Sequence, residues 1–179
     1  MLYLVTDPCY LLNLDPKNKD RIWDLCIDDM YDSDKSNKYE DRTDYTGVQK
    51  ILSEELGINV LRVSDTGYGD WVNSISSTSE HIKIVKYKFC ADTGLMCVVE
   101  INDKLKNYLK DHPIGAIFES DIPVDIHVDD SNSNWFILEI TDKDGYQKLV
   151  TSEDADDEED YYNDYDDFED DKYDWWNIS

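Results

Sequence analysis

Three aspartates beside glycine-containing turns are the residues whose type and spacing could support catalysis. Asp65 and Asp70 bracket the turn Thr66–Gly69, and Asp92 lies two residues before Gly94. Carboxylates gathered at such turns could act as general acid and base, or hold a divalent cation. However, Asp and Gly are also the residues that tight turns require. The sequence favours this structural role, and a cation-dependent enzyme built on the three aspartates remains an alternative.

The histidines and potential nucleophiles offer no second catalytic candidate. His81, His112 and His127 are far apart in the sequence and lack the spacing of a metal site. Asp125, His127 and Asp129 would lie on one face of a strand. Three polar residues in this pattern are more typical of a strand face exposed to solvent than of a functional site. The sequence contains no nucleophile elbow, no phosphate loop and no paired cysteine and histidine motif. We therefore predict that the protein is not an enzyme and uses no catalytic residue, cofactor or metal.

The strongest signal is a run of carboxylates and aromatic rings near the C-terminus. From Glu153 to Asp174 the chain holds fourteen carboxylates and one cation, Lys172, which contribute −13 to the net charge of −25. Residues 1–152 hold 28 acidic and 16 basic side chains, a difference of −12. A tail that only solvates has few aromatic residues, whereas this one carries large rings among its carboxylates. We interpret the run as a surface that a basic partner grips.

The predicted partner-binding residues are of two kinds. The carboxylates would take the places of phosphates, and they are Glu153, Asp154, Asp156, Asp157, Glu158, Glu159, Asp160, Asp164, Asp166, Asp167, Glu169, Asp170 and Asp171. The rings would anchor the run by stacking where bases or arginines lie. These rings are Tyr161, Tyr162, Tyr165, Phe168, Trp175 and Trp176.

The charge density of the run depends on its conformation. A helix rises about 1.5 Å per residue, which places one carboxylate about every 2.4 Å, whereas an extended chain spaces them about 5 Å apart. Duplex DNA carries one charge per about 1.7 Å of axis. Tyr161, Tyr165, Phe168 and Trp175 fall on one helical stripe, although Asp is a poor helix former and like charges repel. We expect the run to become ordered only when it is docked.

Length and composition indicate one globular domain, residues 1–150, followed by an acidic tail, residues 151–179. A pI near 4.1 argues against direct binding to nucleic acid or to an anionic membrane. The chain has no basic leader and no apolar run long enough to span a membrane. Its four cysteines contain no C-x-x-C pair and lie in apolar segments, which predicts reduced core thiols in the cytoplasm.

Apolar patterning predicts an α+β fold, with two N-terminal helices and a mostly antiparallel sheet ahead of the tail. Helices are expected at 16–30 and 47–56, with a shorter one at 102–110. Strands are expected at 2–5, 10–12, 60–63, 81–89, 95–101, 114–118, 124–128, 135–140 and 146–150. The strands 81–89 and 95–101 are expected to pair with each other across a turn, and the last three to form hairpins.

Three short motifs resemble a known group of proteins. They are DPCY (Asp7–Tyr10), TGYGD (Thr66–Asp70) and ADTGLMCVV (Ala91–Val99). In that order they resemble small phage- and prophage-associated proteins of unassigned activity, which carry DPCY, a central GxGDG-type turn and a later D-A-G-L segment. Here Trp71 stands where that group usually has a second glycine, and Thr93 where it has alanine. The resemblance covers residues 2–101 and implies a small β-rich fold and a mobile-element origin, but no reaction.

In composition the chain resembles the acidic DNA-mimic inhibitors that phages use against restriction and CRISPR nucleases. The resulting hypothesis is a phage protein that blocks a host defence nuclease, as an anti-CRISPR against a Cas9-type effector or as an anti-restriction protein. It would occupy the basic DNA- or RNA-binding channel of that partner in the host cytoplasm. It would bind neither nucleic acid nor membrane directly, and a homodimer is possible. The alternative is an acidic interaction module, or a chaperone-like clamp, for a basic protein.

Overall fold

The computed structural model of the chain describes residues 1–17, 19–21, 23–24, 46–65, 71–129, 137–142 and 145–153. Its strands are β1 (Leu2–Thr6), β2 (Val60–Asp65), β3 (Trp71–Ser77), β4 (Ile82–Lys86), β5 (Lys88–Ala91), β6 (Leu95–Glu100), β7 (Ala116–Ser120), β8 (Asp125–Asp129), β9 (Ile137–Asp142) and β10 (Gly145–Glu153). Its helical elements are the 3-10 helix η1 (Pro8–Leu14), α2 (Thr46–Lys50), the π-helical turn η2 (Ile51–Glu55) that continues α2, and α3 (Asp103–Asp111).

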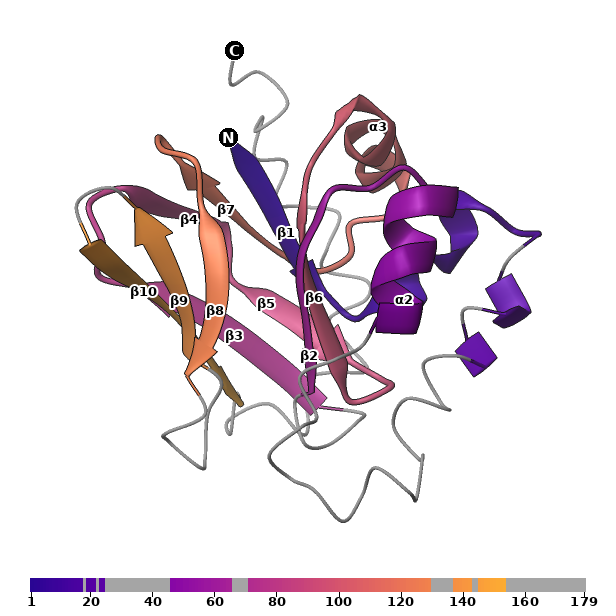
Figure 1. The fold of residues 1–179 in the computed structure, drawn as a ribbon, viewed down its shortest axis with the longest axis horizontal. Coiled ribbons are helices and arrows are strands. Elements are labelled where there is room, and N and C mark those ends of the chain that lie inside the picture. Colours follow the sequence, from indigo (N-terminus) through magenta and orange to yellow (C-terminus); the bar gives the residue numbers. More distant parts are fainter. Residues whose placement is uncertain are drawn as a thin grey trace.

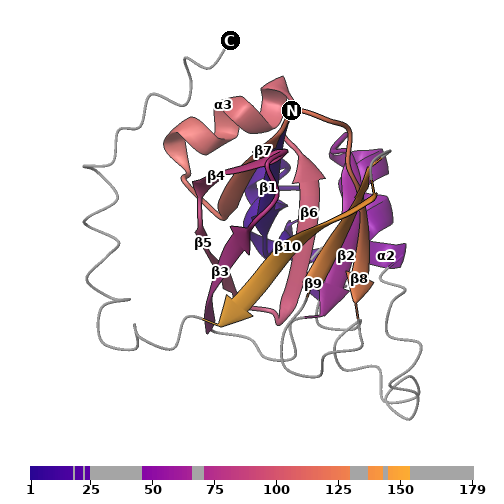
Figure 2. The ribbon, with the colours of Figure 1, turned by 90° about the vertical axis from the view of Figure 1, so that its left-hand side faces the viewer.

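The elements form three layers (Figure 1). Sheet A has the strand order β2-β6-β1-β7-β4, and helices cover its outer face. Sheet B has the order β5-β3-β10-β9-β8 and packs on the other face of sheet A, as the view onto sheet B in Figure 2 shows. Every strand pairing among the described residues is antiparallel. The α+β fold class is therefore confirmed.

The central strands of sheet A are buried on both faces. On β1, Leu4 packs into the core beneath the helices, whereas Tyr3 and Val5 pack into the core between the sheets. The Tyr3 ring stacks on Phe118 of β7, with 5.0 Å between the ring centroids. Burying a side chain such as Leu4 completely contributes about 1.5–3 kcal/mol. This two-sided burial explains why these strands are continuous apolar runs rather than alternating ones.

Helix α3 forms where the sequence predicts it, and one of its side chains contacts the end of η2. The side chain of Asn102 accepts a hydrogen bond from the Leu105 N–H at 2.9 Å, which caps the first turn. Leu105 and Leu109 follow one helical period apart and are buried. Lys104 donates to the carbonyl of Leu56 at 2.9 Å, so that a cation satisfies a carbonyl where the earlier helical segment ends.

The predicted strand 81–89 is wrong as a single element. It divides at Tyr87 into β4, which pairs with β7 in sheet A, and β5, which pairs with β3 in sheet B. Its predicted partner, β6, pairs with β1 and β2 instead. Ile84 packs between the sheets and Val85 packs toward the helices, as successive residues of a strand do, and the register with β7 shifts between Ile84 and Lys86. This irregularity redirects the chain from one sheet to the other.

Two further elements differ from the prediction. Residues 10–12 lie in the 3-10 helix η1, not in a strand, because the side chain of Asp7 caps that helix. Strand β3 is absent from the prediction, since serines and an asparagine interrupt the apolar residues of its sequence, where Ile75 packs into the core between the sheets. The predicted hairpin strands at the end of the domain are confirmed, since β9 pairs with both β8 and β10.

Several expectations fall partly outside the described residues. Of the predicted helix 16–30, residues 19–21 and 23–24 are helical, and 25–30 lie outside the description. Cys9 and Cys97 are buried as predicted and Cys90 is half-buried, whereas Cys26 lies outside it. Strand β10 continues to Glu153, three residues into the range expected to form the tail. None of the helices in the described part of the chain has the length and apolar character needed to cross a bilayer.

Candidate functional site

The acidic run begins at the end of the central strand of sheet B. Glu153 is the last residue of β10, where its backbone lies opposite Asn73 of β3. The run is therefore attached to a strand that is paired on both sides, with β3 and with β9. Of the predicted partner-binding residues, Glu153 alone belongs to the described part of the chain, and 154–179 lie outside it.

The DPCY and ADTG motifs lie at one end of sheet A, and the strand that leads to the TGYGD motif ends there too. Strand β1 ends at Thr6, opposite Cys97 of β6, and the DPCY motif follows directly. Strand β2 ends at Asp65, opposite Leu95, just before the TGYGD motif. The ADTG turn leads into β6 at that same end of sheet A. Trp71 pairs with Ala91 nearby, so β3 starts there as well.

Asp7 holds two of these motifs together (we call this contact the motif junction). Its side chain is fully buried. One carboxylate oxygen accepts a hydrogen bond from the Cys9 N–H at 2.8 Å. The other oxygen accepts from both the N–H and the hydroxyl of Thr93, each at 2.7 Å. The carboxylate thereby caps η1 and fixes the turn between β5 and β6.

The electrostatics of Asp7 reflect two opposing effects. Burial raises the pKa of the Asp7 carboxyl above its ordinary value, and the hydrogen bonds from Cys9 and Thr93 lower it in part. The net direction is upward, because removal from water is the larger effect. A fully buried carboxyl whose donors come from Cys9 and Thr93 can position the backbone, but it has no surface on which to meet a substrate. We therefore assign Asp7 a structural role.

Asp92 lies beside the motif junction but faces solvent. The Tyr10 hydroxyl donates to its carboxylate at 2.8 Å, which forms a second contact between the DPCY and ADTG motifs. This position favours the structural interpretation of the turn aspartates. The backbone of Asp65 is placed by β2, and Asp70 lies outside the described residues. In the described ranges no three His, Cys, Asp or Glu side chains are arranged to hold a metal.

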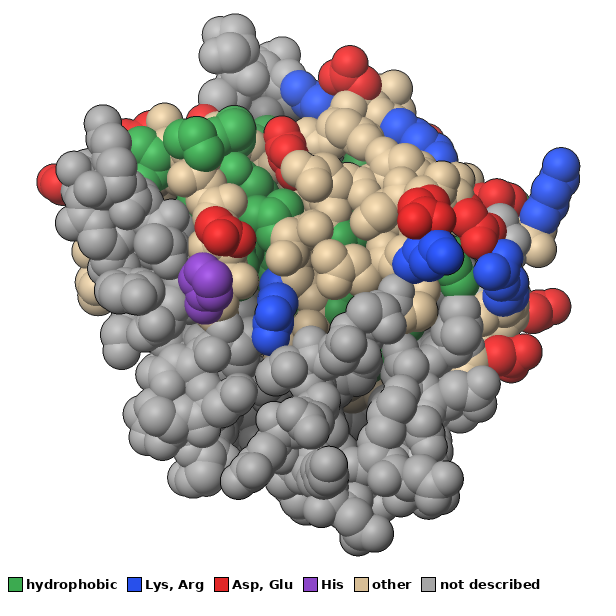
Figure 3. Space-filling view, viewed as in Figure 1, with side chains coloured by type: hydrophobic (Ala, Val, Ile, Leu, Met, Phe, Trp, Pro, Cys, Tyr) green, Lys and Arg blue, Asp and Glu red, His purple; other side chains and the backbone are tan. Residues whose placement is uncertain are grey.

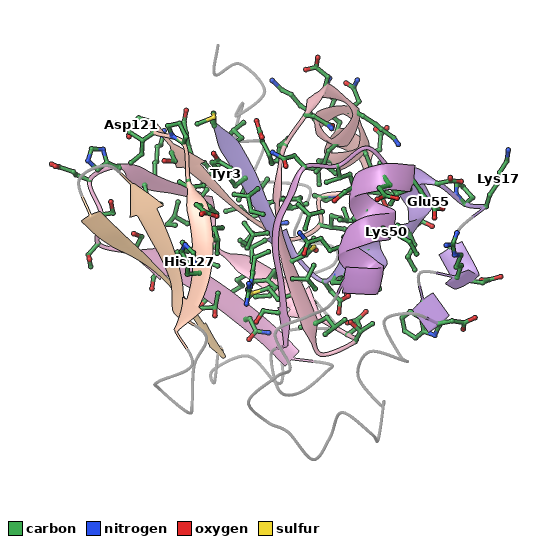
Figure 4. All side chains as sticks on the ribbon, in the orientation of Figure 1. Tyr3, Lys17, Lys50, Glu55, Asp121 and His127 are labelled. Atoms are coloured by element: carbon green, nitrogen blue, oxygen red, sulfur yellow. The ribbon has the colours of Figure 1, made fainter. Side chains whose placement is uncertain are left out.

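The three histidines lie in three separate places. His127 is exposed on β8, with its ring nitrogen 3.5 Å from a carboxylate oxygen of Asp125, as expected for a solvated strand face. His81 contacts Asp121 at 3.0 Å near the opposite end of the molecule from the motif junction (Figure 4). His112 stacks on the ring of Tyr108, with centroids 4.4 Å apart. Each histidine therefore has its own local contact, and the three do not form a common site.

The motifs do not point to one feature of the described residues, a half-buried lysine. Lys86, at the end of β4, donates to the carbonyl of Pro113 at 2.5 Å. Burial lowers the pKa of the Lys86 ammonium to about 8, while the nearby Cys90 acts in the opposite direction. The sequence signal was present but weak, since Lys83, Lys86 and Lys88 stand in a stretch that contains no carboxylate.

Charge is distributed unevenly between the described residues and the rest of the chain. The described residues hold 19 acidic and 12 basic side chains, a difference of −7 out of −25. On the face shown in Figure 3, red and blue side chains interleave over the helical side instead of forming a patch of one sign. Residues 154–179 hold thirteen carboxylates and one lysine, a difference of −12.

Comparison of the chain with protein-family models, with curated proteins and with solved structures gives no match.

Proposed function

We propose that this protein is a non-enzymatic inhibitor of phage or mobile-element origin that blocks a host defence nuclease by imitating the charge of nucleic acid. The observation that carries the proposal is the composition of Glu153–Trp176, which combines fourteen carboxylates and seven aromatic rings with a single cation. A Cas9-type effector or a restriction enzyme presents a channel lined with lysine and arginine. Carboxylates could pair with those cations in place of phosphates, and rings could stack on arginine or fill base positions.

The attachment of the run supports this proposal. The run begins at Glu153, on a strand that pairs with neighbours on both sides. The described residues, whose net charge is −7, would hold the start of the run in place while the strongly charged segment enters the channel of the partner. Because such association is electrostatic, the affinity should fall steeply as salt rises.

The experiment compares full-length baits in affinity capture from a cell extract at low and at high salt. The test variant replaces every Asp and Glu of residues 154–174 with Asn or Gln. The matched control keeps the composition of that run and permutes its order. We expect one dominant basic nuclease to be captured by the wild type and by the control, and to be lost with the test variant and at high salt.

Two outcomes would contradict the proposal. Capture of the same nuclease by the neutralised variant would place the binding surface on the folded residues. Capture of many basic proteins, each weakly held, would favour the alternative, an acidic clamp or interaction module. That alternative draws on the abundance of Asp in the run, since a segment that resists helix formation would adapt to many surfaces.

A further inference from the structure

A basic strip runs along one edge of this acidic protein. Residues 82–91 contain three lysines and no carboxylate, and they form β4, Tyr87 and β5. β4 is the last strand in the order of sheet A and β5 is the first in the order of sheet B, so each lies at the edge of its sheet. In Figure 2 the two strands lie at the left-hand side of the molecule, below α3. We call Lys83, Lys86, Tyr87 and Lys88 the basic edge.

The side chains of the basic edge combine charge with an exposed ring. Lys83 is exposed and lies opposite Glu119 in the strand register, so one carboxylate is its cross-strand neighbour. The Tyr87 side chain is 54% exposed, and the Lys88 ammonium lies 5.7 Å from the centroid of its ring. A ring beside cations fits an anionic segment that also carries aromatic residues, because such a segment can pair its charges and stack its rings.

The acidic run starts close to this edge. Glu153 of β10 lies opposite Asn73 of β3, and Asn73 lies opposite Phe89 of β5. Neighbouring strands are about 4.8 Å apart, so the backbone of Glu153 is about 10 Å from that of Phe89. The 26 residues that follow Glu153 could span up to about 85 Å when extended, far more than they need to reach the edge.

We propose that the basic edge is a docking site for the acidic run of the same chain, residues 154–176. Carboxylates of the run pair with Lys83, Lys86 and Lys88, and its rings pack against Tyr87. Two observations carry this assignment: the charge complementarity of the two segments, and the register that places the start of the run two strands away from β5.

Such a contact would compete with basic proteins for the acidic run, and so would select among possible partners. A tethered segment meets its own docking site at an effective concentration in the millimolar range, so weakly basic proteins would compete poorly for the run. A partner with many more cations than the three lysines of the edge would displace it. The contact itself exists without any partner, so it can be tested separately from the inhibitor proposal.

The test cross-links dilute full-length protein, with no partner present, using a carbodiimide that joins an amine to a carboxylate without a spacer. Mapping by mass spectrometry should find Lys83, Lys86 and Lys88 joined to residues of the run. The yield should fall at least about five-fold between about 0.02 M and about 0.5 M NaCl, because the Debye length shrinks from about 20 Å to about 4 Å. Links spread over all lysines according to their exposure would overturn the assignment.

A matched pair of variants separates the docking site from total charge. Lys83→Gln with Lys88→Gln removes two cations from the edge and leaves Lys86 to hold the Pro113 carbonyl. Lys17→Gln with Lys50→Gln removes two cations from the helical side, where Figure 4 labels both residues away from β4 and β5. The first variant should lose most links between Lys86 and the run, whereas equal yields in both variants would overturn the proposal.

Isotope mixing tests whether the occupant is a second copy of the chain. Equal amounts of ordinary and nitrogen-15-labelled protein are cross-linked together. Links within chains of one isotope support docking within the chain. Links that join the two isotopes at the same rate would assign the basic edge to another copy and overturn the proposal as stated.

Discussion

Carboxylates occur in two contrasting regions of this chain. At the motif junction, Asp7 is fully buried and accepts hydrogen bonds from Cys9 and Thr93, so its identity is fixed by where its donors lie. In the acidic run, thirteen carboxylates follow one another between residues 154 and 174 with a single lysine among them. At the motif junction the position of a single carboxylate is decisive, whereas in the acidic run we expect the number of carboxylates to matter. This difference can be measured.

The largest effect is expected from removing the carboxylate of Asp7. Asp7→Ala leaves the N–H groups of Cys9 and Thr93 buried without their acceptor and removes the cap of η1, at a combined cost of about 3–5 kcal/mol. Urea unfolding should show a lower midpoint with an unchanged slope. The control, Asp92→Ala, loses one exposed hydrogen bond from Tyr10 and should cost about 1 kcal/mol or less. Equal losses would mean that burial does not distinguish the two aspartates.

The raised pKa of Asp7 predicts how the stability of the protein changes with pH. Its folded pKa lies above the ordinary value, so the folded state holds the proton more tightly than the unfolded chain does. Its contribution to stability is therefore largest below the unfolded pKa, and it declines as pH rises through the folded pKa. The free energy of unfolding of the wild type, relative to Asp7→Asn, should decline over that interval. A relative stability that rises there would contradict the assigned direction of the shift.

A smaller loss of stability is expected from substituting a glycine whose backbone conformation and close neighbours leave no room for a side chain. Gly115 has a φ of +73°, and a Cβ built on it would lie 2.6 Å from the carbonyl oxygen of Val5 on β1. Gly115→Ala should cost about 2–4 kcal/mol, from backbone strain and from overlap with the central strand. Gly57 has a similar φ of +68° with open space around it, so Gly57→Ala should cost about 1 kcal/mol. The difference between the unfolding midpoints of the two variants measures the cost of the overlap between the Cβ at Gly115 and β1, because both variants carry the same backbone strain.

The sequence predicts the central strands of sheet A, β1, β6 and β7, because their apolar runs are continuous, but it does not show that two cores share them. Leu4 and Val5 look equivalent in the sequence, although they pack on opposite faces of β1. β3 could not be predicted, because its serines and asparagine lack the apolar alternation by which strands are recognised. The division at Tyr87 follows from a register shift, which depends on pairing with β7 and leaves little trace in the local sequence.

The motif junction could have been found from one signal. Asp7 interrupts an otherwise apolar stretch between Leu2 and Leu12, and an acidic residue in such a place must be buried with partners or must end the strand. Its partner Thr93 is 86 positions away, and no local pattern indicates that distance. The turn aspartates drew attention instead because glycines flank them, and Asp92 proves to be exposed. The acidic run was recognisable from composition alone.

The smallest effect is expected from changing one carboxylate within the run. If number rather than position governs the run, Asp157→Asn and Asp166→Asn should each weaken the binding of an arginine-rich peptide by about 0.2–1 kcal/mol, and by the same amount. Calorimetric titration of full-length protein at one salt concentration would measure both. Replacing four carboxylates should lower the affinity by roughly the sum, since exposed charges that share no fixed partner act almost independently. A loss above about 2 kcal/mol from one substitution would instead indicate a carboxylate with a fixed, desolvated partner, as Asp7 has in the folded domain.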